Sequence, residues 1–211
     1  MKIGLENYFA VPVMYGFLDR TVVDNSLKIS KQYIVSNDWQ SKQLTGKTIT
    51  TYHSDNTLNY LGLVGDTVLL EKINSISRKF LDLLGLDSSM DLLIENWLNL
   101  NPRLSGHYQH EHYASIISGV LYLETDSQDG DLMFYDPIKT RSQAQAYNKK
   151  SKININQYNF QSITVTPEVG KIVLFESWLT HAVSLNLTNS NRISIAFNVF
   201  RDERTQLKWP E

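Results

Sequence analysis

The N-terminal part of the chain carries apolar residues at helical spacing. In segment 66–85 they form one continuous stripe: Leu69, Ile73, Ile76, Phe80 and Leu84. Asp66 is a favourable N-cap residue, and Gly85 can adopt the left-handed conformation that ends many helices. The pattern therefore predicts an amphipathic helix that covers one face of a sheet.

Weaker patterns precede that helix. Residues 21–33 carry apolar residues at intervals typical of a second helix, and residues 8–15 predict a short strand that Pro12 confines to a sheet edge. The polar, turn-rich residues 35–56 predict a connection or a lid. Together these elements form a helical and edge-strand support, residues 1–89, within the single domain that we expect.

Residues 90–201 consist of short extended runs separated by Gly, Pro, Asn and Asp. The runs are LLIENWLNL, HYQHEH, SIISGVLYL, DLMFYDP, SITVTP, KIVLF, HAVSLN and RISIAFNVF. Strands of this length and spacing are typical of an antiparallel sandwich or barrel, and their number favours a jelly roll, or double-stranded β-helix. The sequence thus predicts a mainly β fold with flanking N-terminal helices.

Composition excludes several kinds of chemistry. The chain has 211 residues, enough for one well-buried domain, and its net charge of −2 gives no pull toward nucleic acid or an anionic membrane. It has no cysteine, so a disulfide, a thiolate metal site and a cysteine nucleophile are excluded. The N-terminal segment lacks a run of about 18 apolar residues. We therefore expect a cytoplasmic protein, in the host cytoplasm if a phage encodes it.

Residues 137–167 form a long connection that contains basic residues and no acidic residue. Long loops beside the mouth of a barrel often position the substrate. Three lysines are therefore candidates to contact an anionic partner: Lys149, Lys150 and Lys152. A solvated loop without a partner accounts for the same charges equally well.

Three histidines form a candidate metal site. In an extended segment His110 and His112 point to the same face, because side chains along a strand alternate. His181, much later in the chain, can supply a third imidazole. Three imidazoles suit a borderline divalent metal such as Fe(II), Zn or Cu and leave positions open for substrate and oxygen. Taken alone, His110 and His112 also fit the wet face of an edge strand.

The remaining histidines are not expected at the metal. Strand alternation turns His107 to the face opposite His110 and His112. His53 lies in a polar connection without a neighbour of ligand type, so we expect it to be solvated.

The last extended run has one apolar face and one polar face. The polar face contains Arg192, Ser194, Ala196 and Asn198. An arginine that points into a barrel is costly unless it is paired, because its guanidinium cannot lose its charge. Arg192 therefore predicts an anion, either a ligand carboxylate bound in bidentate fashion or an acidic residue of the protein. A short turn after His181 predicts that His181 and Arg192 lie on adjacent strands.

With these residues the chain resembles an Fe(II)- and 2-oxoglutarate-dependent dioxygenase. It is similar in particular to a family of phage and bacterial 2OG-Fe(II) oxygenases in which a His-x-His element runs into Ser-Gly-x-x-Tyr. Here the element reads His110-Glu111-His112, followed by Ser118-Gly119-Val120-Leu121-Tyr122. The resemblance runs from FAVPV to FNVF, nearly the whole chain, and includes WLN, GDLMFYDP and PEVGKIVLFESWLTHAV in the same order.

The resemblance implies an iron site and a cosubstrate site. The iron ligands would be His110, His112 and His181. The far carboxylate of 2-oxoglutarate would be bound by Arg192 with Tyr122 and Ser194. With O2, the expected reaction is hydroxylation of an unknown protein side chain or small molecule, coupled to oxidative decarboxylation of 2-oxoglutarate to succinate. These three histidines and Arg192 are the implied catalytic residues.

One ligand departs from the common set of two histidines and one carboxylate. Position 112 is His where Asp or Glu is expected, which leaves the site one unit more positive. Either a local bulge brings Glu111 inward or the site has three histidines. We favour three histidines, because the similar family has His at this position.

Two other functions fit the same residues. A jelly roll can bind metal or carbohydrate without catalysis, since the fold hosts many functions. A cupin-like dioxygenase with three histidines would use no 2-oxoglutarate and would not need Arg192. Binding of 2-oxoglutarate that requires both metal and Arg192 would distinguish the 2-oxoglutarate-dependent dioxygenase from these two alternatives.

Overall fold

The computed structural model describes residues 10–39, 47–52, 58–126, 128–138, 156 and 158–202. The strands are β1 (Val13–Phe17), β2 (Ile49–Thr50), β3 (Leu92–Asn101), β4 (His107–His110), β5 (Ile117–Glu124), β6 (Leu132–Tyr135), β7 (Ser162–Val165), β8 (Lys171–Glu176), β9 (His181–Val183) and β10 (Arg192–Arg201). The helices are α1 (Arg20–Ser36), α2 (Tyr60–Val64) and α3 (Thr67–Leu83).

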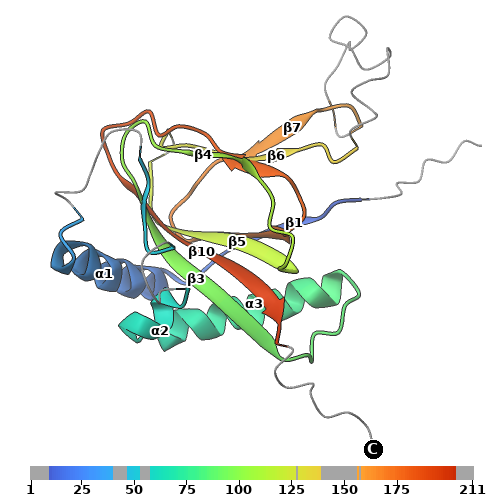
Figure 1. Cartoon of the computed structure of the whole chain (residues 1–211), viewed down its shortest axis with the longest axis horizontal. Coiled ribbons are helices and arrows are strands. Elements are labelled where there is room, and N and C mark those ends of the chain that lie inside the picture. The colour runs from blue at the N-terminus through green and yellow to red at the C-terminus, as the bar shows by residue number, and fades with distance from the viewer. Residues whose placement is uncertain are drawn as a thin grey trace, which may run out of the picture.

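Two antiparallel sheets face each other (Figure 1). The larger sheet has the strand order β1-β8-β5-β10-β3-β2, and the smaller sheet has the order β4-β9-β6-β7. Each extended run predicted within residues 90–201 is a strand, β3 to β10. Consecutive strands of this set alternate between the two sheets, as in a jelly roll, except β6 and β7, which pair with each other in the smaller sheet. The predicted fold class is confirmed.

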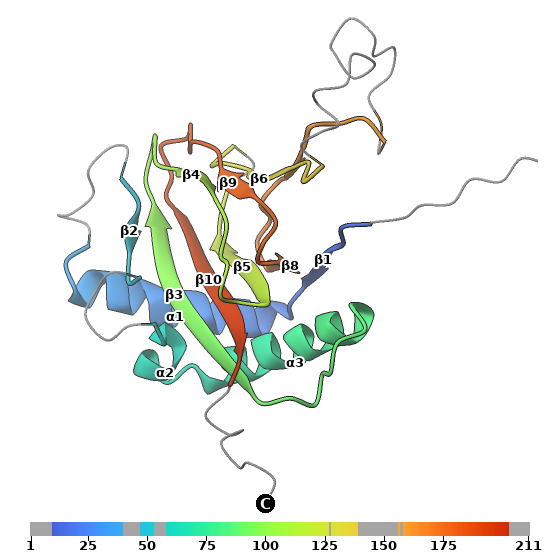
Figure 2. The same cartoon turned by 45° about the vertical axis from the view of Figure 1, so that its right-hand side comes forward.

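The helices cover the outer face of the larger sheet, as Figures 1 and 2 both show. Three residues of the predicted stripe are fully buried: Leu69, Ile73 and Phe80 are all 0% exposed. The other two, Ile76 and Leu84, are partly buried and pack against the same core. The Asp66 carboxylate caps α3 by accepting a hydrogen bond from the Leu69 backbone N–H at 3.2 Å. Gly85 follows the helix with a φ of 71°, the left-handed conformation that was predicted.

Other N-terminal elements differ in extent from the prediction. The helix predicted over 21–33 is the longer α1, and the edge strand predicted over 8–15 is β1, which starts just after Pro12 and pairs only with β8. The helix α2 was not predicted, because five residues are too few to form an apolar stripe. Nowhere in the described ranges is a helix long and apolar enough to cross a membrane.

Two apolar clusters result from this layering. The first lies between the helices and the larger sheet. It includes the side chains of β10 that face the helices, among them Ile193, Ile195 and Val199. The second lies between the two sheets and consists of Tyr122, Leu132, Phe134, Val173, Phe175 and Leu179. The polar side of β10 faces this second space, where the candidate site is found.

Candidate metal and cosubstrate site

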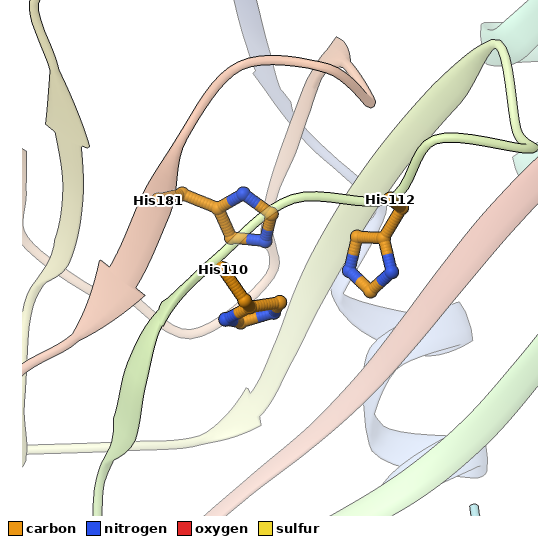
Figure 3. A group of neighbouring side chains, drawn as sticks. All are labelled: His110, His112 and His181. Atoms are coloured by element: carbon orange, nitrogen blue, oxygen red, sulfur yellow. The ribbon is translucent and has the colours of Figure 1, made fainter.

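Three histidine side chains converge between the sheets (Figure 3). His110 ends β4 and His181 begins β9, and the two residues are register partners whose ring centroids lie 4.3 Å apart. The ring of His112 lies 5.0 Å from the ring of His110 and 5.3 Å from that of His181. One ligand nitrogen from each residue lies within 4.8 Å of the other two.

Backbone contacts hold these rings in place. The Nδ1 atom of His110 lies 2.7 Å from the Tyr108 carbonyl oxygen, and Nδ1 of His181 lies 2.8 Å from the Leu179 carbonyl oxygen. A carbonyl only accepts, so both Nδ1 atoms carry the proton and both Nε2 atoms keep a lone pair. His112 has left the strand, and its backbone N–H donates to the Ser177 carbonyl oxygen at 2.9 Å. The donor set therefore fits a divalent metal ion.

Burial keeps the imidazoles of His112 and His181 neutral. It lowers the pKa of His181 to about 3; the Leu179 carbonyl acts in the opposite direction, and the nearby His110, His112 and His107 rings lower the pKa further. Burial, followed by the proximity of His110, lowers the pKa of His112 to about 4. A neutral imidazole is the form that binds a metal, so the site needs no deprotonation at neutral pH.

These pKa values predict that the metal-free protein loses stability as the pH falls from 6.5 toward 4. The histidine pKa is 6.5 in the unfolded chain but about 3 for His181 in the folded protein, so the unfolded chain binds more protons in this range. The contribution of His181 to the free energy of unfolding is complete above pH 6.5. As the pH is lowered, this contribution falls by at most about 1.4 kcal/mol per pH unit. Urea unfolding with a chelator, from pH 7 to 4.5, measures the slope. A His181→Gln variant should show a shallower slope; parallel curves would contradict this assignment.

Glu111 is not part of the histidine cluster. Its carboxylate accepts hydrogen bonds from the Thr180 and Tyr113 hydroxyls. Among the residues with described positions, the group able to hold a metal consists of three histidines and no carboxylate. The geometry therefore corresponds to the three-histidine alternative.

The cluster opens into a cavity of about 90 Å³ between the sheets. Its polar lining comes from both sheets: Asn99, Asn101, His107, His110, His112, Ser118, His181, Arg192, Ser194 and Asn198. Apolar side chains fill the positions between them, including Trp97, Val120, Leu132, Phe175, Val183 and Phe197. The cavity is large enough for a small polar molecule or a few waters.

Arg192 lies in this cavity without a carboxylate partner. Its side chain is buried, and Nη1 donates to the backbone oxygens of Asp129 at 3.1 Å and Gly130 at 2.6 Å. Its Nε has no hydrogen-bond partner, and no salt bridge joins it to an acidic residue within the described part of the chain. The nearby charges of Asp129 and Asp131 act on Arg192 without a direct contact, so a buried guanidinium in this state favours an anion from outside the protein.

Tyr122 on β5 and Ser194 on β10 are register partners of each other, and both lie beside Arg192. The guanidinium carbon lies 6.0 Å from the centroid of the Tyr122 ring. Burial raises the pKa of Tyr122 to about 12, although the charge of Arg192 acts in the opposite direction. Tyr122 therefore keeps its proton and can donate it in a hydrogen bond.

Residues 95–198 match the family model described as "Putative 2OG-Fe(II) oxygenase", and the match includes the three histidines and Arg192. This segment, which contains most of the two-sheet core, belongs to the 2OG-Fe(II) oxygenases. Its cofactor is Fe(II), and its cosubstrate is 2-oxoglutarate. No curated protein matches the sequence of this oxygenase.

Solved structures share the fold at low sequence identity. HygX from Streptomyces hygroscopicus, with nickel and 2-oxoglutarate bound, has a TM-score of 0.60 at 12% identity, covering 91% of this chain and 83% of HygX. A Pseudomonas putida prolyl-4-hydroxylase has a TM-score of 0.57 at 15% identity, covering 90% and 93%. AviO1 from Streptomyces viridochromogenes Tue57 has a TM-score of 0.60 at 12% identity, covering 91% and 90%.

Two sequence-based expectations about the oxygenase site are wrong. His181 and Arg192 are not on adjacent strands, because the chain between them crosses from the smaller sheet to the larger one. His107 does not face away from His110 and His112: the register of β4 against β9 shifts between His107 and His110, and His107 lines the same cavity. An extra residue in a strand reverses the alternation beyond it.

Asn101 is a cavity residue that sequence reasoning did not single out. Its position two residues after Asn99 on β3 was a usable signal, because both side chains fall on the face that lines the cavity. His53 and the basic residues Lys149, Lys150 and Lys152 lie outside the described residues.

Proposed function

We propose that this oxygenase hydroxylates a protein side chain or a small molecule and converts 2-oxoglutarate to succinate and carbon dioxide in the same turnover. The carrying observation is that three imidazoles share a single cavity with one buried guanidinium that makes no salt bridge to a described carboxylate. Imidazoles suit Fe(II), and a guanidinium suits a carboxylate. When bound, Fe(II) supplies the redox chemistry that activates O2.

The metal ligands in this proposal are His110, His112 and His181. The Nε2 lone pairs of His110 and His181 are free to bind a metal, since Nδ1 of each ring donates to a carbonyl oxygen. Three neutral ligands leave the full positive charge of the ion in the cavity. The dianionic cosubstrate would offset that charge, whereas a neutral cosubstrate would not.

Arg192 would bind the carboxylate of 2-oxoglutarate that is far from the metal, with Tyr122 and Ser194 as neutral donors. All three side chains are buried, at 2 to 3% exposure, so that their hydrogen bonds to a carboxylate would not compete with bulk water. Two of the Arg192 donors are fixed by the backbone, which leaves the guanidinium oriented before the ligand arrives.

The primary substrate would contact β3 through Trp97 and Asn99. Both line the cavity, and the Trp97 ring packs against Tyr52 with ring centroids 4.9 Å apart. The Asn99 side-chain oxygen is buried without a hydrogen-bond partner among the described residues. An N–H or O–H group on the substrate would satisfy it, which favours a polar substrate over a hydrocarbon.

An anaerobic absorption titration tests the proposed function. We expect a visible charge-transfer band that appears only when Fe(II) and 2-oxoglutarate are both present, and succinate formation once O2 is admitted. Fe(II) binding without a change in absorption on adding 2-oxoglutarate would contradict the proposal. Slow succinate formation without a primary substrate is the expected behaviour, so the spectrum is the deciding measurement.

A further inference from the structure

His107 occupies a defined position between the metal ligands and Arg192. In the smaller sheet His110, His181 and Phe134 form one row of register partners, and His107, Val183 and Leu132 form the next row. The rows are two residues apart on β9, a distance of about 6.6 Å along a strand. His107, Val183 and Leu132 all line the cavity, so the second row extends its wall away from the metal ligands.

The second row lies opposite Arg192. Gly130, whose carbonyl oxygen accepts from Arg192, lies directly against the backbone oxygen of Ser184, the residue after Val183. A Cβ atom at Gly130 would also lie 3.1 Å from Nη1 of Arg192. Arg192 from the larger sheet and His107 from the smaller sheet therefore face the same end of the cavity.

The His107 ring has no hydrogen-bond partner within the described residues, and its centroid lies 6.4 Å from that of His110. It is not a member of the metal-capable cluster. Burial, followed by the charges of Arg192 and His110, lowers the pKa of His107 to about 4, so the ring is neutral and carries one N–H donor. A partly buried donor without a partner points to a ligand acceptor at this place.

We propose that His107 donates a hydrogen bond to the distal carboxylate of 2-oxoglutarate, opposite Arg192, and so selects a dicarboxylate of this length. The inference rests on the proposed function. A keto acid bound at the His110 row would place its second carboxylate about one row further along the cavity, at His107 and Arg192. The irregularity between His107 and His110 is what turns this side chain inward.

The test compares two keto acids, 2-oxoglutarate and 2-oxopentanoate, which lacks the distal carboxylate. Calorimetry on the Ni(II)-loaded full chain measures both affinities without turnover. In His107→Leu we expect the Kd for 2-oxoglutarate to rise about tenfold, because one hydrogen bond to a charged group is lost. The Kd for 2-oxopentanoate should change less than about twofold, because this keto acid has no distal carboxylate. His107→Gln keeps an N–H donor and should restore most of the affinity.

A Gln109→Leu variant is the matched control, because this side chain is an exposed neighbour on the same strand, β4. Nickel affinity should be equal in all variants, which shows that His107 does not act through the metal or the fold. An equal loss for both keto acids, or no loss in His107→Leu, would overturn the inference while leaving the proposed function intact. Failure of the unaltered protein to bind 2-oxoglutarate with nickel would overturn both.

Discussion

Replacing His181 with alanine is expected to lower succinate formation from 2-oxoglutarate by at least about 100-fold, the upper end of the effect of residues that only support metal ligands. His181 is the buried member of the cluster, and its ring centroid lies within 5.3 Å of both other rings. Its loss leaves two imidazoles, too few to hold the ion in a fixed geometry. Succinate release in the presence of Fe(II) and 2-oxoglutarate is the measurement.

Two further variants separate loss of metal from loss of structure. His181→Gln keeps most of the side-chain volume and should show the same loss of Fe(II) affinity with a similar melting temperature. Gln109→Ala, on the exposed side of β4, should match the unaltered protein in both respects. Turnover in His181→Ala equal to that of the unaltered protein would remove His181 from the metal site.

Replacing Arg192 with methionine is expected to raise the Kd for 2-oxoglutarate by about 100-fold, the effect of two hydrogen bonds to a charged group. Metal affinity in the absence of 2-oxoglutarate should not fall, because the variant removes a positive charge from the cavity. Arg192→Lys keeps the charge but lacks the planar pair of donors, and it should show an intermediate loss. Calorimetry with Ni(II) gives both affinities.

The matched control for Arg192 is Arg103→Met. Arg103 is an exposed arginine whose Nη1 donates to the Asn189 side-chain oxygen at 2.8 Å, on the protein surface. This variant should bind 2-oxoglutarate like the unaltered protein. Full succinate formation by Arg192→Met, with an unchanged Kd for 2-oxoglutarate, would instead remove Arg192 from the cosubstrate site.

Local patterns in the sequence predicted much of the fold. The stripe in α3 and its end residues Asp66 and Gly85 follow from spacing within one helix, and the inward position of Arg192 follows from alternation along one strand. Neither requires knowledge of a distant partner. The same holds for the strands β3 to β10, each of which is bounded by turn residues.

The errors concern pairing between distant segments. His107 faces inward because β4 shifts its register against β9, more than 70 residues later, and no pattern within HYQHEH reveals such a shift. The separation of His181 from Arg192 depends on which sheet each strand joins, which a short connecting turn does not determine.

The buried charge of Arg192 affects how the divalent metal and 2-oxoglutarate bind to the site. Before any ligand arrives, the cavity contains this buried positive charge, which acts against an incoming divalent cation and which the charges of Asp129 and Asp131 offset in part. A dicarboxylate attracts both the cation and the guanidinium. Each ligand therefore strengthens the binding of the other by the same factor. Iron and 2-oxoglutarate load as an overall neutral pair, which ties the iron content of the enzyme to the supply of its cosubstrate.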